Sequence, residues 1–153
     1  MSKFVIKPKS IFSKKEYEIF DEAGKSLYYI KYKWKWKYIA YDSDVHDEVI
    51  YVHERRDLVN GYITSVYIRH KLLGEIEFGF GRGLSIGYKG WEVYGTPSNW
   101  NYMITNVVEN PVVTVSNNLG EIIVDVDESV DDLTALATVV ALSLVGSMKS
   151  KIF

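Results

Sequence analysis

The residues with the clearest chemical potential lie in the stretch IKYKWKWKYIA, residues 30–40, where lysines alternate with large aromatic residues. Successive side chains of an extended chain point to opposite faces. One face then carries Lys31, Lys33, Lys35 and Lys37, and the other carries Tyr32, Trp34, Trp36 and Tyr38. Two interpretations follow. In the first, the lysines form a cationic stripe that binds phosphate groups. In the second, they are the solvent-exposed face of a barrel strand, bent near Trp34, whose aromatic residues pack inward.

Four further cations lie in neighbouring predicted strands and extend this stripe. The predicted ligand-binding residues, for an anionic lipid or a phosphorylated ligand, are therefore Lys31, Lys33, Lys35, Lys37, Arg55, Arg56, Arg69 and Lys71. Tryptophan at the rim of a barrel, here Trp34 or Trp36, also suits a membrane interface. The isoelectric point of about 5.9 is far from the basic value of nucleic-acid-binding domains, so no nucleic-acid partner is expected.

Two glycine-rich patterns resemble catalytic or nucleotide-binding motifs. GLSIG, residues 83–87, places Ser85 in a G-x-S-x-G pattern, which requires a helix after the serine and then Asp and His later in the chain. YKGWEVYG follows instead, and His46, His53 and His70 all lie upstream. GFGRG, residues 79–83, lacks the helix that a dinucleotide fingerprint needs. No catalytic residue is predicted, and the protein is expected not to be an enzyme.

One acidic segment has side chains that could ligate a metal ion at alternate positions, as the start of a calcium-binding loop does. In DSDVHDE these are Asp42, Asp44, His46 and Glu48. A calcium loop requires Gly at its sixth position and Glu at its twelfth, which here are Asp47 and His53. The segment is interpreted as a solvated hairpin tip. Cysteine is absent, which excludes thiolate zinc sites, and neither a metal nor a cofactor is expected.

Length and composition predict one folded domain over residues 1–153. Hydrophobic residues make up 47% of the chain and charged residues 25%, and there are 12 tyrosines. This composition is typical of a globular protein, and aromatic and β-branched residues favour strands. The first residues, MSKFVIKPKS, contain no apolar segment of a secretory signal, so a cytoplasmic location is expected.

Charge is unevenly distributed along the chain. Residues 1–37 hold ten lysines and four acidic residues, whereas residues 90–148 hold eight acidic residues and neither Lys nor Arg. Such asymmetry would orient the protein beside an anionic partner. Alternatively, the two regions mix in space and partly neutralise each other.

Short alternating segments separated by turn residues predict an all-β fold. Eleven strand candidates span residues 16–20, 26–32, 37–41, 48–54, 62–70, 74–80, 84–88, 91–95, 101–107, 112–116 and 121–126. DEAGK joins the first two as a tight hairpin with Gly24 at positive φ, and Asn60-Gly61 marks another turn. This spacing is typical of a sandwich or a barrel.

The C-terminal segment breaks the pattern with a helix predicted from Ser129 to Val145. Ser129 and Asp132 form a variant of the capping box at its start. Its interior polar residues Thr134, Thr138 and Ser143 lie on different sides, and their hydroxyls can bond the helix backbone. A helix that is apolar on every face must be buried all round or lie in a membrane. Its apolar length is too short for a membrane span. A closed antiparallel β-barrel around a central hydrophobic helix satisfies this requirement.

The order of these segments resembles the LURP-one-related proteins of the tubby C-terminal-like superfamily. The resemblance rests on YEIFDEAGKSLYYIKY, YIAYDSDVHDEVIYVHERR, YMITN, VVTVSNNLGEIIVDVD and DDLTALATVVALSL. It implies a closed barrel of about a dozen strands threaded by the C-terminal helix. Tubby-type members bind phosphoinositides and phospholipid scramblases share the fold. The family's acidic residue near the end of the helix has no counterpart around Ser143. No family binding residue transfers to a position of this chain.

The sequence therefore predicts a non-enzymatic binding module of the scramblase-like barrel type, whose basic strand face binds anionic phospholipid or a phosphorylated ligand. The expected partner is an anionic membrane surface, contacted peripherally and without a transmembrane span. The alternative is a scaffold for protein–protein interaction or oligomerisation, which an exposed aromatic patch would favour.

Overall fold

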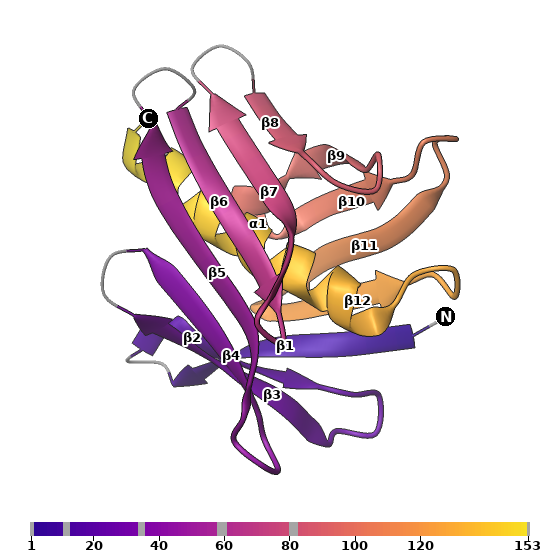
Figure 1. Cartoon of the computed structure of the whole chain (residues 1–153). Coiled ribbons are helices and arrows are strands. Elements are labelled where there is room, and N and C mark those ends of the chain that lie inside the picture. Colours follow the sequence, from indigo (N-terminus) through magenta and orange to yellow (C-terminus); the bar gives the residue numbers. More distant parts are fainter. Residues whose placement is uncertain (1, 11–12, 34–35, 58–60, 80–82, 153) are drawn as a thin grey trace.

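The computed structural model describes residues 2–10, 13–33, 36–57, 61–79 and 83–152, with the backbone alone for residues 9–10, 13–15 and 146–152. The described residues form one antiparallel sheet and one α-helix (Figure 1). The strands are β1 (Ser2–Ser10), β2 (Ser13–Phe20), β3 (Ser26–Lys33), β4 (Lys37–Asp42), β5 (Glu48–Asp57), β6 (Gly61–Ile68), β7 (Lys71–Gly79), β8 (Gly83–Ile86), β9 (Glu92–Thr96), β10 (Asn101–Thr105), β11 (Pro111–Asn118) and β12 (Glu121–Val126). A 3-10 turn, η1, spans Pro97–Asn99, and the helix α1 spans Asp132–Ile152.

The sheet is a nearly closed barrel. Its strand order, β8-β7-β6-β5-β4-β3-β2-β1-β12-β11-β10-β9, is a meander except where β1 pairs with β12. That pairing joins the first strand of the chain to the last, with Phe4 opposite Val124 and Ile6 opposite Ile122. The predicted mostly-β fold, an antiparallel barrel with a C-terminal helix, is confirmed. Between β8 and β9 the described strands leave a seam.

Strand β1 is the element that the sequence prediction missed. SKFVIKPKS carries three lysines and a proline, which weaken its strand signal. Phe4 and Ile6 nevertheless alternate inward, and both are buried. Pairing to two partners, β2 and β12, stabilises this strand beyond its local preference.

Helix α1 lies inside the barrel and is buried on every side, as predicted. Every residue from Ala135 to Leu142 is buried. Figure 1 shows α1 crossing the barrel from the side of β12 to the end where β5 and β7 terminate. Two interior hydroxyls bond the helix backbone as expected, because Thr138 Oγ1 donates to the Thr134 carbonyl and Ser143 Oγ donates to the Val140 carbonyl.

The ends of the helix differ from the predicted ones. The cap is Asp131 rather than Ser129, because the Asp131 carboxylate accepts the backbone N–H of Thr134 at 3.0 Å and its hydroxyl at 3.1 Å. Ser129 instead bonds Asp127 in the preceding turn. The helix also continues past Val145 to Ile152.

Two further predictions about strands are wrong. The interpretation of residues 30–40 as one strand bent near Trp34 is wrong, whereas the separate strands predicted at 26–32 and 37–41 are confirmed, because β3 ends at Lys33, Trp36 has a φ of 63°, and β4 begins at Lys37. Arg69 and His70, predicted inside a strand, form the turn between β6 and β7 with φ values of 49° and 69°. Neither turn contains the Gly or Asn that normally signals positive φ.

Candidate functional site

The lysine-rich stretch folds into a hairpin that keeps its lysines on one face. In the register of β3 and β4, Lys33 lies opposite Lys37 and Tyr32 lies opposite Tyr38. The two tyrosines point inward, with ring centroids 5.5 Å apart and nearly perpendicular planes. Lys31, two residues before Lys33, shares the outer face with Lys33 and Lys37. Lys35 and Trp34 lie outside the described residues.

Strand β5 extends this face by two basic side chains. His53 lies opposite Lys37, and Arg55 follows two residues later on the same side. Partial burial lowers the pKa of the His53 imidazole, and the charges of Lys37 and Arg55 lower it further. Lys37 and Arg55 thus place positive charge beside the imidazole. We call Lys31, Lys33, Lys37, His53 and Arg55 the basic face.

Three lysines of the basic face form no ion pair with a described carboxylate. Arg55 is paired, because its guanidinium lies 2.9 Å from the Glu75 carboxylate and 3.1 Å from Ser65 Oγ. Within the described part of the chain, no ion pair includes Lys31, Lys33 or Lys37. Lys31 Nζ instead lies 5.8 Å from the centroid of the Tyr29 ring. These three lysines are accessible to an external anion.

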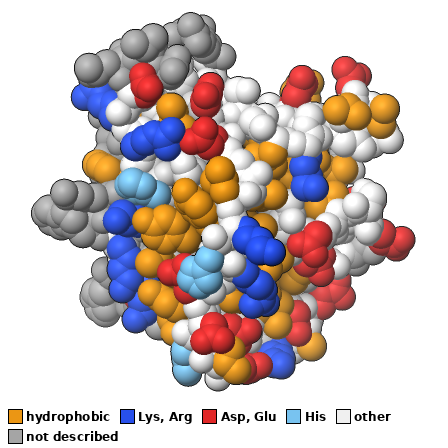
Figure 2. All heavy atoms as spheres, in the orientation of Figure 1, with side chains coloured by type: hydrophobic (Ala, Val, Ile, Leu, Met, Phe, Trp, Pro, Cys, Tyr) orange, Lys and Arg blue, Asp and Glu red, His pale blue; other side chains and the backbone are white. Residues whose placement is uncertain are grey.

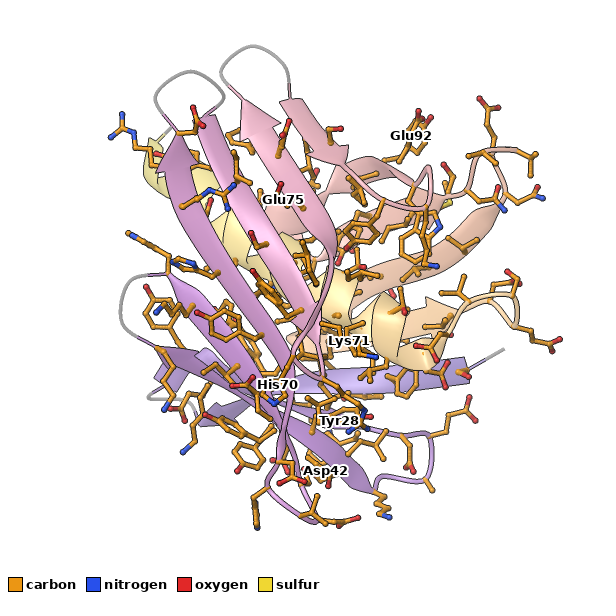
Figure 3. All side chains as sticks on the ribbon, viewed as in Figure 1. Tyr28, Asp42, His70, Lys71, Glu75 and Glu92 are labelled. Atoms are coloured by element: carbon orange, nitrogen blue, oxygen red, sulfur yellow. The ribbon has the colours of Figure 1, made fainter. Side chains whose placement is uncertain are left out.

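Three of the predicted ligand-binding residues lie elsewhere. Arg56 alternates to the inner side of β5, opposite Tyr62 and at the end of the barrel, where it is exposed. Arg69 and Lys71 lie at the opposite end of the β6–β7 hairpin, beside His70. Figure 3 shows His70 and Lys71 near Tyr28 and Asp42, well apart from Glu75, the partner of Arg55. The structure thus brings together part of the predicted set.

Tyrosines share the outer surface with the cations. Tyr29 and Tyr41 stack with ring centroids 5.2 Å apart, and Tyr51 and Tyr67 meet edge to face at 5.7 Å. A shallow hollow of about 380 Å³ is lined by Glu48, Tyr51, Tyr67 and His70. Figure 2 shows hydrophobic side chains beside a column of Lys and Arg at the left of the view. The aromatic patch and the basic face are therefore adjacent.

Charges segregate between the two ends of the barrel. At the end where α1 terminates, which we call the basic end, β3 ends, β4 begins and β5 ends. Among the side chains that the structure describes, the strands carry the cations Lys33, Lys37, Arg55 and Arg56 there. The other end, the acidic end, carries Asp21, Glu22, Asp42, Asp44, Asp47, Glu48, Asp127, Glu128, Asp131 and Asp132. The segregation is partial, because Lys3, Lys25, Arg69, Lys71 and Lys89 also lie toward the acidic end. The positive end of the helix dipole faces the acids.

A partly enclosed cavity of about 230 Å³ lies at the seam, toward the basic end. Its lining residues are Phe78, Leu84, Val93, Gly95, Thr96, Pro97, Ser98 and Val145. They come from β7, β8, β9, η1 and the helix, so that the cavity exists because β8 and β9 do not pair. The sequence prediction missed it, because nothing in the residue pattern shows which strands remain unpaired.

The described residues contain no catalytic constellation at the positions considered. Ser85 lies on β8, exposed on the outer side and opposite Glu77. Among the residues whose positions are described, no group of three His, Cys, Asp or Glu could hold a metal ion. The Asp42 carboxylate accepts the backbone N–H groups of Asp44 and Val45, which lowers its pKa and closes a hairpin tip, as predicted.

A buried carboxyl group was not predicted. Glu54 lies on the inner side of β5 and is 2% exposed, and burial raises its pKa to about 8. The sequence signal was its place in the alternation of EVIYVHE, which puts Glu54 on the side of Val52.

The chain shares its fold with a protein of solved structure. The X-ray structure of a protein from Arabidopsis thaliana, AT5G01750, superposes with a TM-score of 0.67 at 15% sequence identity, covering 94% of this chain and 90% of that chain. No protein-family model matches the sequence, and no curated protein matches it. Within the described segments, no helix is long and apolar enough to cross a bilayer.

Proposed function

We propose that this chain is a LURP-one-related member of the tubby-like barrels and acts as a non-enzymatic module that binds anionic phospholipid with its basic end. The observation that carries the proposal is the cluster of Lys31, Lys33 and Lys37 on one face with no carboxylate partner among the described residues. The protein would lie peripherally on the cytoplasmic leaflet, with its acidic end turned away from the lipid.

Charge segregation supports a surface rather than a small soluble ion as the partner. The described cations of the basic face lie on three neighbouring strands, β3, β4 and β5, and do not converge on one enclosed pocket. An extended anionic surface contacts many such charges at once. Each Lys near a membrane of this kind contributes about 1 kcal/mol. Three lysines therefore contribute about 3 kcal/mol, which is on the order of a hundredfold in partitioning.

The test is co-sedimentation with liposomes of phosphatidylcholine alone or with added phosphatidylglycerol or phosphoinositide, over a series of salt concentrations. We expect binding that needs the anionic lipid and weakens with salt. A variant with Lys31, Lys33 and Lys37 changed to Gln should lose about a hundredfold in partitioning. The matched control changes Lys3, Lys25 and Lys89, exposed cations nearer the acidic end, and alters the net charge equally.

The imidazole of His53 provides a second measurement. An anion bound beside Lys37 would offset the positive potential that lowers the His53 pKa. Titration of the imidazole signals by NMR, with and without a soluble inositol phosphate or glycerol phosphate, should show the pKa rising on binding. Equal loss of liposome binding in the two lysine variants, or no binding at low salt, would refute the proposal.

The adjacent tyrosines favour one alternative, a surface for another protein. Tyr41, Tyr51 and Tyr67 lie beside the basic face, and such rings are common in protein interfaces. A variant with Tyr51 and Tyr67 changed to Ser separates the two functions. It should bind liposomes as the wild type does if lipid is the partner of the basic end.

A further inference from the structure

The seam between β8 and β9 is the one interruption among the described strands of the barrel. Strand β8 pairs with β7 and β9 pairs with β10, but no described residues pair β8 with β9. The cavity of about 230 Å³ lies where β8 begins and β9 ends, next to η1. Figure 1 shows β8 and β9 as neighbouring edges of the sheet, and α1 passing behind β5, β6 and β7.

The inner part of this cavity is apolar. Phe78 is 7% exposed and Val145 of the helix is 3% exposed, and Leu84 and Val93 are partly buried side chains from the two edge strands. The polar residues Thr96 and Ser98 are exposed and belong to the mouth. The lining is therefore apolar at its inner end, whereas polar atoms make up the larger part of its accessible surface. An apolar group of a ligand fits the inner end.

The volume of the cavity, about 230 Å³, limits the size of the ligand. It exceeds the roughly 150 Å³ of an apolar cavity that binds benzene. It is smaller than the roughly 300 Å³ at which sites for drug-sized molecules begin. The cavity therefore has room for part of a molecule, such as a short length of hydrocarbon chain, and the rest of that molecule must lie at the mouth or outside.

The position of the seam separates the cavity from the basic face. Val145 lies in the C-terminal half of α1, and Phe78 and Leu84 adjoin the β7–β8 connection, so the cavity opens toward the basic end. In the strand order β4 and β3 are four and five strands away from β8, so Lys31, Lys33 and Lys37 lie across the barrel from the seam. We infer that the seam cavity binds a single hydrocarbon chain of an amphiphile, independently of these lysines. This inference rests on the cavity and not on the proposed function.

The first experiment uses monomeric probes, so that no membrane is needed. The uncharged alcohols from hexanol to dodecanol and the corresponding short-chain lysophosphatidylglycerols are titrated below their aggregation concentrations by calorimetry. We expect saturable binding at one site, strengthened about fourfold by each added methylene until the cavity is full. Affinity should then stop rising with chain length. A continued rise, as in adsorption to an exposed apolar surface, would overturn the inference.

A cavity-filling variant locates the site. Val93→Trp places an indole in the cavity and should weaken decanol binding at least tenfold. Val108→Trp is the matched control, because Val108 is 67% exposed and lies outside the cavity lining. If Val93→Trp does not fold, NMR on the wild type serves instead. Contacts from decanol to the methyl groups of Leu84, Val93 and Val145 support the site. Contacts confined to Val107, Val108 and Leu119 refute it.

The proposed lipid-binding function and the proposed chain site in the seam cavity can be refuted independently of each other. The variant with Lys31, Lys33 and Lys37 changed to Gln should bind decanol and lysophosphatidylglycerol as the wild type does, because these lysines lie across the barrel from the cavity. Liposome binding without any binding of monomeric probes would leave the proposed function standing and overturn the seam cavity as a chain site. Decanol binding at the cavity together with no response to anionic lipid would confirm the chain site and refute the proposed function.

Discussion

Glu54 lies directly opposite Thr64 where β5 pairs with β6, and both side chains are buried inside the barrel. Among the residues that the structure describes, neither the carboxyl oxygens of Glu54 nor the hydroxyl of Thr64 has a hydrogen-bond partner. The pKa of Glu54 rises to about 8 because burial disfavours the carboxylate. At neutral pH the folded protein therefore holds Glu54 mostly protonated.

The raised pKa of Glu54 predicts that stability falls as the pH increases. The folded protein retains a proton between the ordinary pKa of 4.5 and the raised value of about 8, whereas the unfolded chain releases it. The free energy of unfolding should decline across this window by up to about 5 kcal/mol and stay level above it. Urea unfolding from pH 4 to pH 9 measures the slope.

Glu54→Gln should flatten this slope, because the amide does not titrate. Glu77→Gln is the control, since Glu77 is exposed on the outer side of β7 and should leave the slope unchanged. A Glu54→Gln variant with the slope of the wild type would show that Glu54 is not the group responsible.

Asp131 rather than Ser129 should determine the stability of the start of α1. Asp131→Ala removes the carboxylate that accepts the Thr134 N–H and hydroxyl, and should cost about 1 kcal/mol of unfolding free energy. Ser129→Ala should cost less, because Ser129 contacts the preceding turn. Thermal unfolding of the two variants under the same conditions compares the two losses of stability. The opposite order would restore Ser129 as the cap.

The strand series was predictable because alternation reports which side chains face a core. EIIVDV was predicted as a strand over residues 121–126 and is β12 without change. The strand candidates also ended at residue 32 and resumed at residue 37, on either side of the turn at Trp36. The lysine–aromatic alternation by itself did not indicate that turn, because a hairpin in which Lys33 faces Lys37 keeps lysines and aromatics on the same two sides as an unbroken strand. Alternation alone does not distinguish the two.

The candidate site was predictable only where it depends on local alternation. Lys31, Lys33 and Lys37 share a face for this reason, and the prediction of that face needed no tertiary information. Arg69 left the predicted set because of a turn without glycine. The seam cavity depends on which distant strands fail to pair, and the unpaired state of Glu54 depends on what packs around it. Neither follows from residue order.

The hydroxyl of Tyr88 should anchor the β8–β9 connection to the helix. It lies 2.7 Å from Thr138 Oγ1, whose own proton goes to the Thr134 carbonyl, so that Tyr88 is the donor. Burial raises the pKa of Tyr88 to about 12. Tyr88→Phe should cost about 1 kcal/mol of unfolding free energy by leaving Thr138 with one bond fewer. Tyr94→Phe, at an exposed hydroxyl bonded to Glu92, should cost less. Equal losses in chemical denaturation would contradict this anchor.

The central position of α1 predicts the effect of a charge in its middle. Val140 is 1% exposed, with buried helix residues on both sides of it. Val140→Asp would place a carboxyl group where the barrel offers no water, at a cost of several kcal/mol, which exceeds what a domain of this size can lose. We expect the variant to be unfolded by circular dichroism and by its NMR spectrum.

Two controls separate the charge from the change in volume and from the substitution itself. Val140→Ala should lose about 2 kcal/mol through the cavity it leaves, yet remain folded. Val108→Asp, at a residue 67% exposed, should be as stable as the wild type. A Val140→Asp variant that unfolds cooperatively at the same denaturant concentration as Val108→Asp would mean that this side of the helix faces solvent. The strands would then not enclose the helix.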